Sequence, residues 1–128
     1  MVEQVYNAFL SCDQKVTTDT RNIAKNNLFF ALKGPNFNGN KFAEKAIELG
    51  AKYAVIDEKD YFIEGKTFLV ENVLETLQSL ARFHREKINI PGVAITGTNG
   101  KTTTKELLGA VLSSKYNILI TQGNLNNH

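Results

Sequence analysis

The residues with the clearest chemical potential are Gly97, Gly100, Lys101 and Thr102, which follow a short apolar run at residues 93–96. Two glycines let the backbone turn tightly, so that successive N–H groups can face one anion. A following helix would add its free N-terminal N–H groups to the same place. The pattern predicts a nucleoside triphosphate site in which Lys101 is the catalytic residue, reaching the β- and γ-phosphate oxygens, and Thr102 is a Mg²⁺ ligand.

The spacing of this loop differs from the common phosphate loop. Two residues separate Gly97 from Gly100-Lys101, whereas the common loop has about four between its first glycine and the Gly-Lys pair. The plain alternative is a strand-to-helix turn with a solvated lysine, which leaves the three threonines at 102–104 unexplained. The predicted ATP-binding set is Gly97, Thr98, Asn99, Gly100, Lys101, Thr102 and Thr103.

Strand and helix patterns alternate through the rest of the chain, which predicts an α/β domain. Helices are expected at residues 2–10, 42–49 and 73–84, and strands at 15–19, 28–32, 53–56 and 67–70. Residues 34–40 are expected to form a loop, and 57–66 a surface connection. The predicted domains are 1–87, a linker at 88–92, and an incomplete second domain at 93–128 with a strand, a helix at 101–114 and a strand at 116–121.

The composition is typical of a soluble globular protein, with 42% hydrophobic and 22% charged residues. No apolar run approaches the roughly 20 residues of a membrane span. The net charge of +2 is too small, and the basic residues too scattered, to indicate a nucleic-acid partner. The start of the chain lacks a signal-peptide pattern, so the cytoplasm is the expected compartment. Oligomeric state stays open.

Other candidate side chains are expected to be structural. Cys12 is the single cysteine, and we expect a structural thiol. His84 is expected at a solvated helix end. The carboxylates form no acid/base pair and are expected to face solvent; they are Glu44, Glu48, Asp57, Glu58, Asp60, Glu71 and Glu75.

Residues 96–104, Thr-Gly-Thr-Asn-Gly-Lys-Thr-Thr-Thr, resemble the ATP-binding loop of the Mur ligases, the ATP-dependent amide-bond ligases of peptidoglycan assembly, and of their folylpolyglutamate synthetase relatives. The resemblance implies ATP and Mg²⁺ as cofactors. It also implies a small amino-terminal Mur ligase domain followed by the first strand, phosphate loop, helix and strand of a truncated ATPase-type central domain. Residues 105–106 and 121–128 are most similar to the member that adds D-alanyl-D-alanine to UDP-N-acetylmuramoyl-tripeptide.

The resemblance extends to residues 18–21 (Thr-Asp-Thr-Arg), 27–34 and 39–42, which are similar to the segments that hold the UDP-sugar in this family. Hydroxyl and amide groups can pair with uracil, an aromatic ring can stack on it, and arginine can fork onto phosphate. The implied UDP-sugar set is Thr18, Thr20, Arg21, Pro35, Asn36, Phe37, Asn126 and Asn127. Without the resemblance, these segments are a turn with side-chain-to-backbone bonds and a polar loop.

The implied activity is phosphorylation of the substrate carboxylate by ATP, followed by attack of the D-alanyl-D-alanine amine on the acyl phosphate. The chain alone is expected to be inactive as a ligase, because the acidic Mg²⁺ ligands, adenine contacts and dipeptide site are missing from it. Three alternatives stay open. They are a Mur ligase that adds the third-position diamino acid, a stand-alone UDP-sugar-binding module, and an unrelated regulatory P-loop NTPase.

Overall fold

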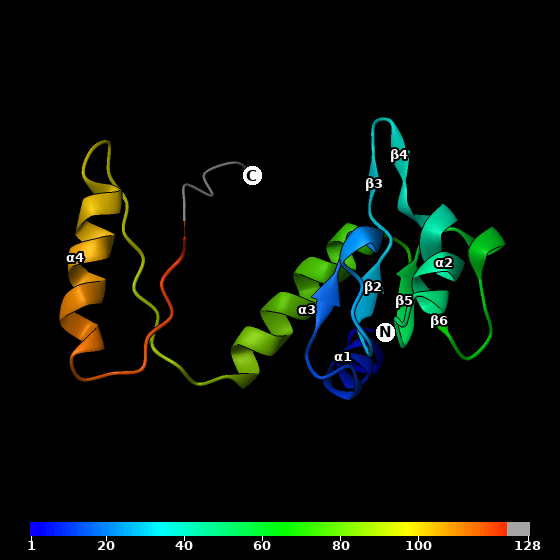
Figure 1. The fold of residues 1–128 in the computed structure, drawn as a ribbon, viewed down its shortest axis with the longest axis horizontal. Helices are drawn as coiled ribbons and strands as arrows, with labels where there is room; N and C mark the ends of the chain where they lie inside the picture. The colour runs from blue at the N-terminus through cyan, green and yellow to red at the C-terminus, as the bar shows by residue number, and fades with distance from the viewer. Residues whose placement is uncertain (123–128) are drawn as a thin grey trace. The chain divides into compact units, whose positions relative to one another are not determined.

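Four parallel strands form the centre of the first of two structural units. The computed structural model describes residues 1–122, and its chain divides into a first unit, Met1–Asn89, and a second that begins at Ile90. The elements of the first unit (Figure 1) are α1 (Val2–Ser11), β1 (Val16–Thr17), η1 (Thr20–Asn22), β2 (Leu28–Phe30), β3 (Lys33–Gly34), β4 (Phe37–Asn38), η2 (Gly39–Phe42), α2 (Ala43–Glu48), β5 (Tyr53–Ile56), η3 (Lys59–Tyr61), β6 (Thr67–Leu69) and α3 (Val73–Lys87).

The sheet order is β1-β2-β5-β6, with every neighbouring pair parallel. Leu28 pairs with Tyr53 and Phe30 with Val55. All three residues of β2 are buried, as expected for a parallel strand with both faces covered. The predicted α/β class is therefore confirmed.

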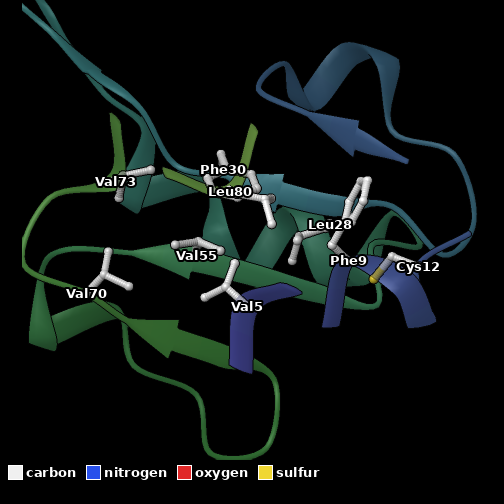
Figure 2. Packing of buried hydrophobic residues seen from close by; sticks show 9 residues of the cluster. All are labelled: Val5, Phe9, Cys12, Leu28, Phe30, Val55, Val70, Val73 and Leu80. Atoms are coloured by element: carbon white, nitrogen blue, oxygen red, sulfur yellow. The ribbon is translucent and has the colours of Figure 1, made fainter. Parts of the chain in front are cut away.

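The alternation of side chains along β2 divides the core into two layers. Leu28 and Phe30 join residues of α1 and α3 on one face, where Figure 2 shows Val5 and Phe9 of α1 beside the sheet. Phe29 faces the other way and packs with α2. The helix patterns predicted at 2–10, 42–49 and 73–84 are confirmed, and the last continues to Lys87.

Cys12 and His84 are two side chains near α1 that are shielded from solvent. Cys12 is fully buried, which agrees with a structural thiol, and burial raises its pKa. His84 was expected to be solvated, and this was wrong. Its ring is half-buried against α1, 5.0 Å from Phe9 between centroids, with Nδ1 3.5 Å from the Tyr6 hydroxyl oxygen.

The loop predicted at residues 34–40 is also a different structure. Strands β3 and β4 form an antiparallel hairpin, in which Lys33 pairs with Asn38 and Gly34 with Phe37, and Pro35 and Asn36 make the two-residue turn. The hairpin continues directly into η2. Its strands are too short for the alternation of apolar and polar residues to show, so the sequence pattern indicated only the turn residues.

The second unit contains the helix α4 (Lys101–Ser113) and extended segments on either side of it. The helix predicted at 101–114 is confirmed. The strands predicted at 93–96 and 116–121 are not formed, and this part of the prediction was wrong. A strand is defined by its ladder of hydrogen bonds, and the described residues of this unit provide no paired neighbour for either segment. Gly109 lets the extended segment lie close to α4, because a Cβ there would collide with the Ile120 side chain.

Candidate functional site

A cleft of about 400 Å³ lies beside η1 in the first unit. Its lining residues are Thr18, Asp19, Thr20, Arg21 and Phe37. The family resemblance implied one UDP-sugar set that includes Thr18, Thr20, Arg21 and Phe37, and the fold brings these four to one cleft although Phe37 is distant from the others in the chain. The cleft thus combines hydroxyl groups, a guanidinium and an aromatic ring.

Asp19 organises the polar wall of the cleft. It precedes η1, and its Oδ1 accepts a hydrogen bond from the Arg21 backbone N–H at 2.9 Å, which is a helix-capping arrangement. The same carboxylate accepts from Arg21 Nε at 3.0 Å and from Nη2 at 2.8 Å. These hydrogen bonds from Arg21 lower the pKa of Asp19 to about 2.

The forked pair leaves part of the Arg21 guanidinium available. Within residues 1–122 the Nη1 group makes no hydrogen bond, and the Arg21 side chain is largely exposed. A guanidinium has five N–H donors, of which the pair with Asp19 uses only a fraction. Arg21 can therefore stay fixed by Asp19 and still donate to a phosphate oxygen.

Phe37 supplies the aromatic wall. It lies on β4, is about half exposed, and stacks on Phe42 with a centroid distance of 5.4 Å and an interplanar angle of 13°. One face of the Phe37 ring is thus held by Phe42, and the residue still borders the cleft. A flat base could stack on such a supported ring.

The rest of the predicted UDP-sugar set is placed differently. Pro35 and Asn36 are exposed at the hairpin turn and are not among the residues that line the cleft. Asn126 and Asn127 lie outside the described residues.

The loop predicted to bind phosphate turns at two glycines before α4. Gly100 lies in the left-handed region at φ 74° and caps α4, and Gly97 has φ 151°. The Thr104 N–H donates to Gly100 O at 2.9 Å, so the helix ladder starts directly after the loop. Thr102 and Thr103 stand exposed in the first turn of α4, and Thr98 and Asn99 are exposed before it.

Lys101 folds back over this loop, where its Nζ donates a hydrogen bond to the Gly97 carbonyl oxygen. The predicted ATP-binding residues are therefore contiguous around one turn, and the Lys101 ammonium group lies against the backbone of that turn. The exposed Thr102 hydroxyl is an oxygen donor of the kind that Mg²⁺ accepts when phosphate oxygens and water complete the shell. In the described part of the chain, no three His, Cys, Asp or Glu side chains gather as a metal site.

A polar network beneath the hairpin was not indicated by the sequence. Asn40 is fully buried; its Nδ2 donates to Asp57 Oδ1 at 2.8 Å, and its Oδ1 accepts from the Asp57 N–H at 3.0 Å. Lys33 Nζ lies 3.0 Å from Asp57 Oδ1. Asn38 Nδ2 donates to both oxygens of Glu58, at 3.1 and 3.0 Å.

The expectation that Asp57 faces solvent was wrong, since its side chain is only 7% exposed. Burial by itself would raise the pKa of Asp57. Hydrogen bonds from Lys33, Asn40 and the Val73 N–H outweigh that effect, so the pKa lies below its usual value. The pKa of Lys33 is shifted in the direction that such a pair requires, because its hydrogen bond to Asp57 raises it. The only advance signal was the pair of asparagines around Gly39, a residue type that often bonds to nearby backbone.

None of the helices in residues 1–122 combines the length and apolar character that crossing a membrane requires. Comparison with known proteins assigns both units. The family model described as "Mur ligase family, catalytic domain" matches residues 14–94, and the one described as "Mur ligase middle domain" matches residues 95–128.

The similar curated proteins include UDP-N-acetylmuramoyl-tripeptide–D-alanyl-D-alanine ligases. The ligase of Haemophilus influenzae is 38% identical over 118 residues, covering 89% of this chain and 26% of the relative. That of Synechocystis is 42% identical over 115 residues, covering 88% and 25%. The chain thus spans about a quarter of the length of these relatives.

Solved structures agree in fold. A MurF ligase from Thermotoga maritima in complex with ADP has a TM-score of 0.75 at 33% identity, over 88% of this chain and 26% of that one. A MurF from Acinetobacter baumannii has a TM-score of 0.76 at 30% identity, over 98% and 30%. With a family model covering more than half its length, this chain belongs to the Mur ligase family.

Proposed function

We propose that this chain is the amino-terminal part of an ATP-dependent ligase that adds D-alanyl-D-alanine to UDP-N-acetylmuramoyl-tripeptide in peptidoglycan synthesis. The names of the similar curated proteins support this assignment. The observation that carries it is the presence in one chain of a cleft lined by hydroxyl, guanidinium and aromatic groups and of a separate Gly-Lys-Thr turn before a helix.

In this proposal residues 1–87 hold the UDP-sugar. The uracil stacks on Phe37, hydroxyl groups of Thr18 and Thr20 bond the nucleoside, and Arg21 donates to the diphosphate. Pro35 and Asn36 would contact the substrate from the hairpin turn. Asn126 and Asn127 stay in the proposed set on the family resemblance alone.

Residues 93–128 would open the ATP-binding domain, after a linker at 88–92. Backbone N–H groups from Thr98 to Thr103 would position the phosphates, and Lys101 would leave the Gly97 carbonyl to neutralise charge on the transferring phosphoryl group. Thr102 would hold Mg²⁺, and the ion when bound would neutralise part of the negative charge on the phosphates. The terminal carboxylate of the muramoyl-peptide attacks the γ-phosphorus to form an acyl phosphate and ADP. The dipeptide amine then attacks the acyl carbon to form the amide bond, and phosphate and the amine proton are released.

A cytoplasmic location fits an ATP-dependent step on soluble nucleotide precursors, and we include it in the proposal. Two other candidates keep some support. A Mur ligase for the third-position diamino acid would share both sites, and a stand-alone UDP-sugar-binding module would need only the first.

Calorimetric titration of the 128-residue chain with UDP and, separately, with MgATP tests the proposal. We expect UDP binding that Phe37→Ala weakens and Lys101→Ala leaves unchanged. We also expect weak MgATP binding through the phosphate loop alone, which Lys101→Ala abolishes and Phe37→Ala leaves unchanged. UDP binding without any MgATP binding would favour the stand-alone module. Absence of UDP binding to a folded chain would contradict the assignment of the first unit.

Ligase activity is tested separately, by following amide formation from UDP-N-acetylmuramoyl-tripeptide and D-alanyl-D-alanine. We expect no product from the 128-residue chain by itself. A preference for a diamino acid over D-alanyl-D-alanine by an enzyme that contains this chain would favour the alternative ligase.

A further inference from the structure

Phe37, the aromatic wall of the cleft, lies on a hairpin that has little stability of its own. Phe37 is part of a hairpin with only two residue pairs, Lys33 with Asn38 and Gly34 with Phe37. An isolated two-stranded hairpin is marginally stable in water, and this one is far shorter than most. Its orientation must therefore be set by contacts outside its own ladder.

Besides the stacking of Phe37 on Phe42, the contacts that hold it include polar groups at the carboxyl end of β5. Each strand of the hairpin is bound there: Lys33 of β3 reaches Asp57, and Asn38 of β4 is gripped by both oxygens of Glu58. Asn40 continues the connection, because its side chain donates to Asn38 Oδ1 at 3.0 Å as well as to Asp57.

The side chains that make these hydrogen bonds differ in burial. This difference distinguishes the residues that support the core from the residue that positions the hairpin. Asn40 and Asp57 are enclosed, and Asp57 Oδ2 also accepts from the Val73 N–H at the start of α3, at 3.4 Å. Glu58 is 36% exposed, and its side chain bonds only to Lys33 and Asn38 within the described residues. Glu58 therefore acts on the hairpin and on nothing else in the core.

We propose that Glu58, supported by the buried Asn40–Asp57 pair, is a positioning residue that fixes the β3–β4 hairpin so that the Phe37 ring is presented to the nucleoside base in the cleft. The inference rests on the proposed UDP-sugar site. The hydrogen bonds of the Glu58 carboxylate are charge-assisted, and such bonds are stronger than neutral ones. A Phe37 ring that is already held in position loses little conformational freedom when the base stacks on it. Removing the carboxylate loosens the hairpin, chiefly at Asn38 of β4, without touching any residue that lines the cleft.

The test combines UDP titration with amide hydrogen exchange on the 128-residue chain. Glu58→Ala should weaken UDP binding by about fivefold, which corresponds to about 1 kcal/mol, and should speed amide exchange across residues 33–38 because the hairpin is less firmly held. The matched control is Glu64→Ala, which removes an exposed carboxylate from the same connection between β5 and β6. It should change neither quantity.

A double-mutant cycle with Phe37→Ala identifies the route of the effect. If Glu58 acts through the Phe37 ring, the loss caused by Glu58→Ala should disappear in the Phe37→Ala background. Equal losses in both backgrounds would overturn the inference. Glu58→Gln, which keeps an oxygen for Asn38 and removes the charge, replaces Glu58→Ala if that variant does not fold, and should give the same signs with smaller size.

The two proposals fail in different ways. Unchanged exchange across residues 33–38 in Glu58→Ala overturns the positioning role, whatever happens to UDP. Faster exchange together with no UDP binding by the unsubstituted chain overturns the proposed UDP site and, with it, the role of the hairpin in binding.

Discussion

Replacing Gly39 by alanine should unfold the junction between the hairpin and η2. Gly39 is buried where the chain leaves β4, and its N–H donates to Leu32 O at 2.9 Å. A Cβ at this position would lie 2.6 Å from the Ala31 carbonyl carbon and 2.8 Å from Leu32 N, and closer still to Leu32 O. These are backbone atoms of the segment after β2, so no side-chain rotation can make room.

The expected cost follows from three contributions. Overpacking a closed site costs about 1–3 kcal/mol. Loss of the Gly39 N–H bond adds about 1 kcal/mol. The reduced freedom of alanine in the unfolded chain returns about 0.4–1 kcal/mol. The free energy of unfolding should fall by about 2–3 kcal/mol, which for a unit of this size lowers Tm by about 10–15 °C.

Thermal and urea unfolding followed by tyrosine fluorescence and far-ultraviolet circular dichroism measure this change. The chain has no tryptophan, and Tyr6, Tyr53 and Tyr61 report on the first unit. Gly34→Ala is the matched control, since a Cβ at this nearby glycine, which lies on β3 of the hairpin, meets nothing within 4 Å. The reasoning is refuted if Gly39→Ala melts within about 2 °C of the unsubstituted chain, or if Gly34→Ala is destabilised equally.

Three further outcomes are expected. Leu80→Ala, which removes a buried α3 side chain from the core under β2 and β5, should lower the free energy of unfolding by about 2–5 kcal/mol in the same assay; a cost below about 1 kcal/mol would contradict the packing described. The Cys12 thiol, buried and with its pKa raised by burial, should react with a thiol reagent only after denaturation, and rapid labelling of the folded chain would argue against its enclosure. The Asp19 carboxyl should titrate near pH 2 by carbon NMR. The stabilisation from its pair with Arg21 is therefore complete above the unfolded pKa of about 3.9 and is lost as pH falls through about 2. Arg21→Ala should raise the titration midpoint toward about 4, and an unchanged midpoint would show that Arg21 does not lower the pKa of Asp19.

Much of the first unit could be read from local patterns. The apolar run at residues 28–32 predicted the buried β2, and the helical spacing of Val73, Leu77 and Leu80 predicted α3. Such patterns depend on neighbours two to four positions apart, and the sequence contains those directly. Part of the cleft could be anticipated too, because Thr18, Thr20 and Arg21 are adjacent in the chain and needed only a turn to share a surface.

The extended segments around α4 show where local pattern fails. Residues 93–96 are apolar and well suited to a strand, but a strand also requires hydrogen-bonded neighbours, which the described residues do not supply. Strand propensity is a statement about fitting a sheet, and it carries no information about whether that sheet is present.

The sequence by itself determined the class of the fold and the glycine turn at Gly97 and Gly100 before α4, and its family resemblance indicated the chemical types that meet in the cleft. Tertiary structure alone decided that His84 packs on α1 and that Asp57 is buried beside the hairpin. The bonds of Asn40 to Asp57 and of Lys33 to Glu58 join residues 17 and 25 positions apart. No local rule links such positions, because their contact exists only after the parallel sheet has brought the ends of β2 and β5 together.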